Sequence, residues 1–251
     1  MRLAGWPGLI MALLLGGAAC TADSRHSEMG ATLTIFASTS LTEVFTSMAN
    51  GFSTAYPAVR VNLTFGPDSD MARRSAAGPA PDLIALEGQA PMAMAGPTST
   101  PVLFARNQLV LAIPADNPKG LRALADLSRP DIRAALCAES EPCGTVAATA
   151  LAEAQVPVPA TAIRVTDVRA ALAQLQDGHV DVALVYRSDA RLAGDTVATL
   201  EFAQSQAAQA DLYAAIPTTA QNPVAARTFL EYLTSPSTLD GLTHAGFRPP
   251  I

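Results

Sequence analysis

The sequence predicts an α/β protein with mainly parallel sheets, and three observations indicate this fold class. Short runs of β-branched and apolar residues alternate with segments in which apolar residues recur at helical spacing. This alternation of strand and helix favours parallel strands joined by right-handed crossovers. Two such series of similar length fill the 251 residues, so we expect two lobes, each a mainly parallel sheet flanked by helices.

The first series begins after a polar N-terminal segment. Its first helix carries apolar residues on one face, and Ser40 followed three residues later by Glu43 indicates a capping box, which places the helix start at Ser40. A second, shorter helix ends at Gly78. The series is expected to contain strands at 31–37, 59–65 and 81–87 and helices at 40–56 and 69–78.

The second series follows a further strand, and the chain closes with two helical segments. Asn222 with Pro223 is typical of a helix start, because proline is tolerated in the first turn. The expected strands are 108–114, 133–139, 162–166, 180–186, 200–204 and 211–217, and the expected helices are 145–154, 167–178, 222–235 and 236–246.

Residues 1–19 are predicted to be a signal peptide and not part of the fold. Their apolar run, 9–15, is too short to span a bilayer, and small residues precede Cys20. A cysteine at that place resembles the lipid-attachment site of bacterial lipoproteins, with 20–30 as a short tether. We therefore expect an exported lipoprotein on the extracytoplasmic face that touches the membrane only through its lipid; ordinary secretion is the alternative.

The cysteines form an even number once Cys20 is set aside. Cys137 and Cys143 remain, six residues apart, and disulfides persist in exported proteins. We expect this pair to be bridged; two buried free thiols are the alternative. No directly coordinated metal is expected, because no further cysteine is present and the three histidines are scattered.

Charge and motifs exclude several function classes. The net charge is −6 and the 16 basic residues form no block, so nucleic acid is not an expected partner. The sequence lacks the nucleophile elbow, the zinc-protease helix, the phosphate-binding loop and the dinucleotide fingerprint. Ser40 as a nucleophile would need a base, and nothing places a histidine beside it. We expect a binding protein without a cofactor rather than an enzyme, although missing motifs alone do not exclude an enzyme.

The ligand is expected where the strands end and the helices begin, because ligands of such sheets lie beyond the carboxyl ends of the strands. Helix starts also favour anions, since their free N–H groups and dipole attract negative charge. The candidate segments are 38–40, 68–70, 143–145, 166–168 and 186–188.

Several segments resemble the periplasmic molybdate-binding proteins of ABC transporters. They include "ATLTIFASTSLTEVFTSMANGFSTAYPAVRVNLTF", "EPCGTVAATAL", "VTDVRAALAQLQDG" and "VDVALVYRSDA", and the likeness covers most of 31–248 in order. The resemblance implies a two-lobed, type II solute-binding fold, with lobe 1 at 31–110 plus 207–251 and lobe 2 at 111–206. It also implies a monomer that binds molybdate or tungstate in the cleft and delivers it to a membrane permease.

The resemblance also implies a set of neutral donors for the oxyanion. The family's hydroxyl falls on Ser40, its backbone N–H donors fall on Cys143 and Val168, and its phenol falls on Tyr186. A disulfide to Cys137 would fix the N–H of Cys143. The alternatives are that Ser40 only caps its helix and that Tyr186 is only an aromatic residue at the rim.

One position departs from the family's pattern. The family usually carries a serine pair in the turn after the second strand; here Asp68 takes the first place and Ser69 the second. Two unit charges ~4 Å apart repel by about 4 kcal/mol at an effective dielectric near 20, and a dianion roughly doubles this. Micromolar binding is worth only about 8 kcal/mol. An ionised Asp68 facing the cleft would therefore abolish tight binding.

Three arrangements avoid this conflict. Asp68 caps its own helix and leaves Ser69 to the ligand; or it is protonated and donates a hydrogen bond; or the ligand is a different solute. Arg187, next to Tyr186, either offsets the negative charge of Asp68 or is solvated. The sequence predicts a solute-binding lipoprotein for molybdate or tungstate that serves an ABC permease. A binder of another solute, or an anchored interaction module without transport, is the alternative.

Overall fold

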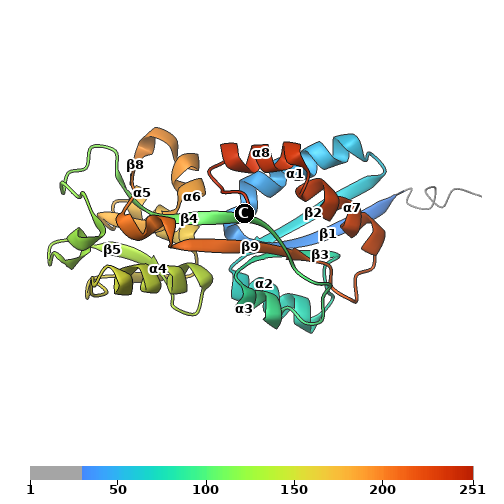
Figure 1. Cartoon of the computed structure of the whole chain (residues 1–251), viewed down its shortest axis with the longest axis horizontal. Helices are drawn as coiled ribbons and strands as arrows, with labels where there is room; N and C mark the ends of the chain where they lie inside the picture. Colours follow the sequence, from blue (N-terminus) through green and yellow to red (C-terminus); the bar gives the residue numbers. More distant parts are fainter. Residues whose placement is uncertain (1–29, 251) are drawn as a thin grey trace, which may run out of the picture.

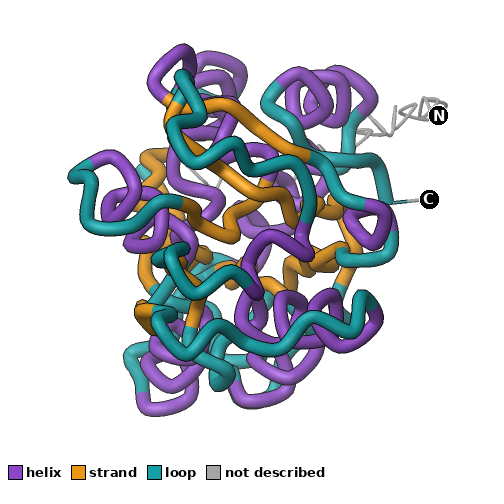
Figure 2. The backbone as a smooth tube through the Cα atoms, turned by 90° about the vertical axis from the view of Figure 1, so that its left-hand side faces the viewer, coloured by secondary structure: helices purple, strands orange, loops and turns teal. Residues whose placement is uncertain are grey.

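The computed structural model describes residues 30–250, which form an elongated α/β molecule of two lobes side by side (Figure 1). The predicted signal peptide, Cys20 and most of the tether lie outside the described residues. Viewed from one end, helices surround the strands of the nearer lobe (Figure 2). The strands are β1 (Ala31–Ser38), β2 (Val59–Gly66), β3 (Leu83–Glu87), β4 (Val102–Pro114), β5 (Ala134–Cys137), β6 (Ile163–Val165), β7 (Val182–Tyr186), β8 (Val197–Leu200) and β9 (Gln209–Ala215).

The helices alternate with these strands in both lobes. Short 3-10 turns, at Thr39–Leu41, Leu124–Ser128, Gly194–Thr196 and Ala203–Gln206, complete the pattern. None of the helices in the described part of the chain is long and apolar enough to cross a membrane. The helices are α1 (Thr42–Ala55), α2 (Asp68–Ala77), α3 (Gln89–Met94), α4 (Pro142–Glu153), α5 (Val168–Gln176), α6 (Arg187–Leu192), α7 (Pro223–Leu233) and α8 (Pro236–His244).

A single path of paired strands runs through the molecule in the order β2-β1-β3-β9-β4-β7-β5-β6, with β8 paired to β4. β1 is parallel to β2 and to β3, and β5 is parallel to β6 and to β7. β4 and β9 are antiparallel to their neighbours and to each other. The predicted α/β class with two lobes is confirmed, but each sheet is mixed: three parallel strands lie at its outer side, and β4 and β9, antiparallel to their neighbours, join the lobes.

Each lobe has its own apolar core. In lobe 1, Phe45, Phe52, Phe104 and Phe229 pack together with ring centroids 5.0–6.1 Å apart, joining α1 and α7 to the sheet. The core of lobe 2 is built from buried residues of 109–210, and that of lobe 1 from residues before 106 and after 211. The boundary between the two cores therefore lies within β4 and β9, close to the predicted lobe limits. The exact residues at which the lobes begin and end remain a prediction.

Three predicted elements differ clearly from the structure. The strand expected at 108–114 begins earlier, at Val102, and so extends into lobe 1. The strand expected at 200–204 lies earlier, as β8, because residues 203–206 turn into a 3-10 helix in which Ser205 is buried and donates to the Leu109 carbonyl. The helix expected at Ser40 begins instead as the 3-10 turn Thr39–Leu41, and α1 proper starts at Thr42. The short helices α3 and α6 had no expected counterpart, since six residues are too few for a clear helical period.

Candidate functional site

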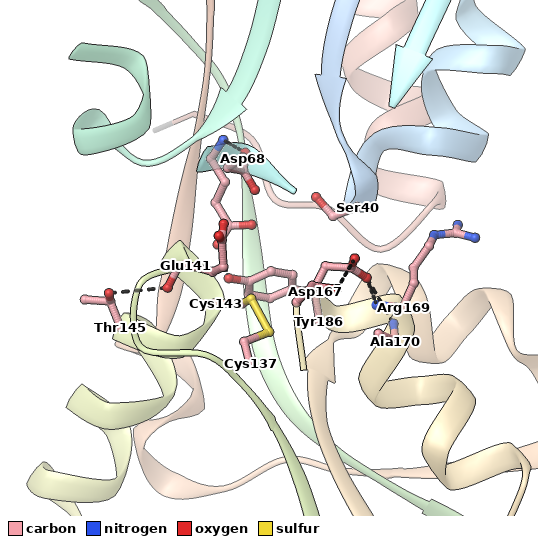
Figure 3. The surroundings of a disulfide bond; sticks show 12 residues. Ser40, Asp68, Cys137, Glu141, Cys143, Thr145, Asp167, Arg169, Ala170 and Tyr186 are labelled. Carbon is pink, nitrogen blue, oxygen red and sulfur yellow. Dashed lines mark hydrogen bonds between the residues drawn. A yellow bond between two sulfur atoms is a disulfide. The ribbon is translucent and has the colours of Figure 1, made fainter. Parts of the chain in front are cut away.

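The strand ends of the two lobes face one another at their junction. Figure 3 shows Ser40 and Asp68 of lobe 1 on one side, and Glu141, Cys143 and Tyr186 of lobe 2 on the other. All five residues are at most 8% exposed. The structure therefore brings together residues from four of the five candidate segments, as the carboxyl-end rule predicts.

Ser40 lies in the 3-10 turn that follows β1, and its hydroxyl is 3.2 Å from that of Ser38. The predicted capping box is wrong: no side chain caps either the turn or α1. The Glu43 carboxylate instead forms an ion pair with Arg169 of the other lobe. The Ser40 residue in this turn is buried, at 6% exposed.

Asp68 does not cap its own helix, since Pro67 is the N-cap of α2 and no side-chain cap bond is made there. Its carboxyl instead accepts the Ser38 hydroxyl at 2.9 Å and the backbone N–H of Glu87 at 2.7 Å. Burial raises the pKa of Asp68 to about 7, although these two hydrogen bonds lower it. The structure thus contradicts the first of the three predicted arrangements and agrees with a carboxyl that takes up a proton near neutral pH.

Glu87 ends β3 and is the largest omission from the predicted site. Its carboxyl is buried, 2% exposed, and accepts the phenolic O–H of Tyr186 across the lobe junction. Burial, and then the negative charge of Asp68, raise the pKa of Glu87 well above its usual range. The Tyr186 hydroxyl, predicted to face the oxyanion, is therefore held by a carboxyl of the other lobe.

Ser69 and Glu141 form a second contact between the lobes. The Ser69 hydroxyl donates to the carboxyl of Glu141 at 2.5 Å, and the Ser69 N–H lies 3.3 Å from the other carboxyl oxygen. Glu141 is the N-cap of α4, and its carbonyl accepts the N–H groups of Gly144 and Thr145. Both donors that the sequence assigned to the ligand at Ser69 are thus directed at an acid of lobe 2.

The remaining predicted donors lie at two helix starts of lobe 2. Cys143 stands in the first turn of α4, where backbone N–H groups have no partner within the helix, and a disulfide joins it to Cys137 as predicted. Val168 is the first residue of α5. The side chain of Asp167 caps this helix and accepts the N–H groups of the two residues that follow Val168 (Figure 3).

Two charged residues of α6, Asp189 and Arg187, differ in burial and in the partners they contact. Asp189 is 2% exposed, and burial raises its pKa to about 7, although the nearby Arg169 lowers it; the Arg169 Nε lies 3.9 Å from its carboxyl. Arg187, considered as a cation that offsets Asp68, pairs instead with Glu201, whose side chain is half exposed. It therefore does not compensate the acids at the junction.

The junction combines anion donors with acids. The Ser40 hydroxyl and the starts of α4 and α5 suit an oxyanion, whereas Asp68, Glu87 and Glu141 oppose one when ionised. Among residues 30–250, no group of three or more histidine, cysteine or acidic side chains is arranged to hold a metal ion. A cavity of about 360 Å³ opens beside Glu87 and is also lined by residues of α3, α4 and β9.

Glu87 and Glu141 were missed although the sequence contained a signal for one of them. Glu87 directly ends the predicted strand 81–87, so the rule that ligands lie beyond strand ends applied to it as well. Glu141 precedes α4 by sequence but reaches the other lobe through its side chain, and no periodicity predicts such a contact.

Comparison with known proteins agrees with this architecture. Residues 33–248 match the family model described as bacterial extracellular solute-binding protein. The molybdate-binding protein ModA of Mycobacterium bovis is 32% identical over 259 residues, covering 97% of each chain, and that of Mycobacterium tuberculosis is equally similar. These relatives are named as binding proteins, not as enzymes.

Two solved structures show the same fold. The periplasmic molybdate-binding protein of Azotobacter vinelandii has a TM-score of 0.72 at 14% identity, covering 87% of this chain and 100% of that one. The sulfate-binding protein SubI of Mycobacterium tuberculosis has a TM-score of 0.74 at 19% identity and covers 87% of each chain. The match of the family model and the full-length relatives confirm the predicted resemblance: this chain belongs to the family of bacterial extracellular solute-binding proteins.

Proposed function

We propose that this protein captures molybdate, or the similar dianion tungstate, between its two lobes and delivers it to an ABC permease. The observation that carries the proposal is the meeting of hydroxyl and N–H donors from both lobes at one junction, in a chain 32% identical over its length to molybdate-binding proteins. A small tetrahedral oxyanion is the solute that such short, neutral donors fit, because each oxygen can accept from a different helix start or hydroxyl.

Each donor has a defined place in this proposal. Ser40 supplies a hydroxyl from lobe 1, and Cys143 and Val168 supply backbone N–H groups from lobe 2. The Ser38 hydroxyl donates to Asp68 and is not one of these donors. Tyr186 holds Glu87 rather than the anion in the described arrangement. The protein acts as a monomer and without a cofactor.

A second candidate is the same fold with a different solute. The observation that favours it is the presence of Asp68, Glu87 and Glu141, three buried carboxyls from three elements, at the place where a dianion would lie. A solute with a hydrogen-bond donor or a positive charge would satisfy ionised carboxyls there, whereas a dianion requires them to be protonated.

Thermal unfolding of the purified protein with molybdate, tungstate and sulfate distinguishes the two. A ligand at 100 times its dissociation constant stabilises by about 2.7 kcal/mol, which raises the midpoint of a chain of this size by roughly 5–10 °C. We expect this rise with molybdate and tungstate but not with sulfate. If no oxyanion shifts the midpoint until Asp68 is changed to serine, the scaffold is intact and the natural ligand is a different solute.

Residues outside the described part carry a separate proposal. We propose that the chain is exported, cleaved before Cys20 and lipidated there, which would keep the protein near its permease. The mass of the mature protein tests this directly: cleavage and lipid addition should be lost in Cys20→Ala. If the mature wild-type mass is that of an unmodified chain, the protein is secreted without an anchor.

A further inference from the structure

Two carboxyl contacts hold the lobes together at the proposed site. Glu87 of lobe 1 accepts the Tyr186 hydroxyl of lobe 2, and Glu141 of lobe 2 accepts the Ser69 hydroxyl of lobe 1. Asp68 lies between them, bonded to the N–H of Glu87 and adjoining Ser69 in the chain. We call Asp68, Glu87 and Glu141 the junction carboxyls. Asp68 and Glu87 belong to lobe 1 and Glu141 to lobe 2, so charge on them acts across the lobe junction.

The junction carboxyls have no cation of their own. Among residues 30–250, no arginine or lysine forms an ion pair with any of the three. Arg169, which also spans the junction, is directed at Glu43 and Asp189. Three ionised carboxylates without a cation in a buried junction repel one another strongly, because burial lowers the effective dielectric.

The other titratable groups around them add negative charge or none. Tyr186 faces Glu87 as a neutral hydrogen-bond donor. The negative charges of Asp189, on α6, and of Glu141 raise the pKa of Glu87 further. Across the adjoining cavity stands Asp211 of β9, whose carboxylate accepts from Arg106 at 2.7 Å and from the Tyr213 hydroxyl at 3.2 Å. Hydrogen-bond donors stabilise the ionised carboxyls in part, but no cation of the described residues pairs with them, and a proton taken up by one of them removes its charge in place.

We propose that the junction carboxyls make closure of the lobes depend on uptake of a proton, and that a captured oxyanion therefore enters together with that proton. The proton resides on Asp68 or on Glu87, which are joined through the Glu87 backbone N–H, and the Glu141 carboxyl faces them from lobe 2. When the proton leaves, the carboxylates repel one another across the junction and the lobes separate. The part of this inference that concerns oxyanion binding rests on the proposed function; the part that concerns lobe closure does not.

Lobe separation can be measured without any ligand. Small-angle X-ray scattering of the purified protein between pH 6 and pH 9 should show a radius of gyration that increases with pH. Asp68→Asn and Glu87→Gln should remove most of this increase, since an amide keeps the shape of the carboxyl and cannot ionise. Asp70→Asn is the matched control, because Asp70 lies on the same helix but its side chain is 45% exposed. It should behave as the wild type.

Proton uptake on binding is measured by calorimetric titration with sodium molybdate in two buffers of different ionisation enthalpy. We expect about one proton taken up per anion, and a dissociation constant that falls up to tenfold per unit decrease in pH between pH 8 and pH 6. In Asp68→Asn the number of protons and the slope should both fall toward zero, while Asp70→Asn should keep them.

The outcomes separate this inference from the proposed function. Molybdate binding that is independent of pH, with no proton uptake and a constant radius of gyration, overturns the inference and leaves the proposed function intact. A radius that depends on pH through Asp68 and Glu87, with no oxyanion bound at any pH, supports lobe closure by a proton and overturns the proposed ligand. A radius that rises with pH equally in Asp68→Asn and Asp70→Asn assigns the change to other groups and overturns the inference.

Discussion

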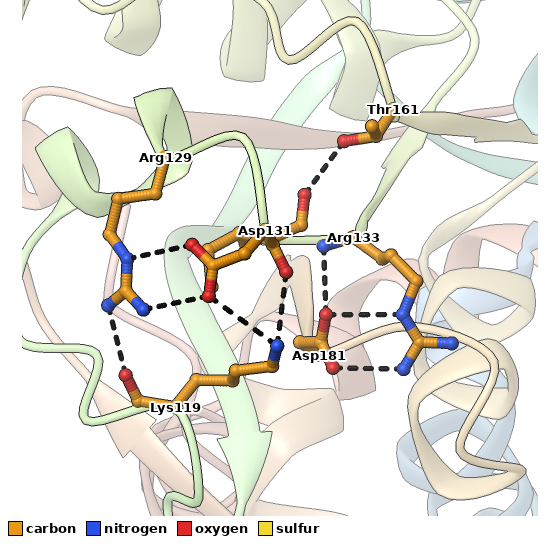
Figure 4. A network of polar contacts seen from close by, with 7 residues as sticks. Lys119, Arg129, Asp131, Arg133, Thr161 and Asp181 are labelled. Carbon is orange, nitrogen blue, oxygen red and sulfur yellow. Dashed lines mark hydrogen bonds and ion pairs between the residues drawn. The ribbon is translucent and has the colours of Figure 1, made fainter.

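Two groups of carboxylates in this protein face opposite electrostatic surroundings. In lobe 2, Asp131 pairs with Arg129 and Lys119, and Asp181 forms a two-bond contact with the Arg133 guanidinium (Figure 4). These hydrogen bonds lower the pKa of both aspartates. At the lobe junction, Asp68 and Glu87 have no cation, and burial raises the pKa of both.

The difference shows that the residue type alone does not decide the charge of these acids. Asp181 is itself 9% exposed, about as buried as Asp68 at 7%, yet its pKa moves in the opposite direction. What differs is the partner: Asp181 has a guanidinium and a backbone N–H from Arg133, whereas Asp68 has only neutral donors and a second carboxyl beside it. The stability of the protein should therefore depend on pH with opposite signs at the two places.

The largest expected effect comes from Asp68→Asn. The pKa of Asp68 is raised from 3.8 to about 7, so the stability that its protonated form contributes is complete below pH 3.8 and is lost as pH rises through about 7. The amide stays neutral throughout. At pH 8 the variant should be more stable than the wild type by about 2 kcal/mol; the difference should be smaller at pH 5 and should vanish only as pH falls below 3.8. Urea unfolding at both pH values measures this; a variant that is less stable at pH 8 contradicts it.

A smaller effect of opposite sign is expected from Asp181→Asn. The pKa of Asp181 is lowered, so its contribution is present above the usual value of 3.8 and is lost as pH falls below it. Because the Arg133 side chain is half exposed, solvent weakens the pair, and the variant should lose about 1 kcal/mol at pH 7. The same urea series extended to acid pH provides the measurement. The two proteins should converge there, and a difference that persists would assign the loss to packing.

Asp131→Asn should have the smallest effect. The carboxylate and the guanidinium of Arg129 lie at the surface, where salt and water screen their attraction. We expect no measurable change in the thermal midpoint at physiological ionic strength and at most a slight decrease at low salt. A large decrease at either salt concentration would mean that this network holds its loop in place and that its ion pairs are not screened as surface pairs are.

Much of this molecule was predictable from its sequence, for identifiable reasons. Strands such as β1 and β7 were predicted within two residues, because continuous β-branched and apolar runs are typical of buried parallel strands. The rule that ligands lie beyond strand ends also brought Ser40, Asp68 and Tyr186 to one place. The fold class followed from the alternation of strand and helix alone.

The contacts between the lobes were not predictable in the same way. Glu43 fits a capping box by its spacing from Ser40, but an arginine 126 residues further along competes for it. Glu141 and Ser69 meet across 72 residues of sequence. A local sequence pattern predicts the structure of one segment by itself. These side chains instead form hydrogen bonds and ion pairs with residues that come close only in the folded chain.

Gly144 has a consequence for how this cleft can change. A side-chain carbon built at this position would lie 2.0 Å from the carbonyl oxygen of Ala138, so the segment from Cys137 to Cys143 folds tightly onto the first turn of α4. That segment carries Glu141. Any substitution at 144 would lift it and withdraw Glu141 from Ser69. The range of solutes open to variants of this protein is thus limited by a residue that has no side chain of its own.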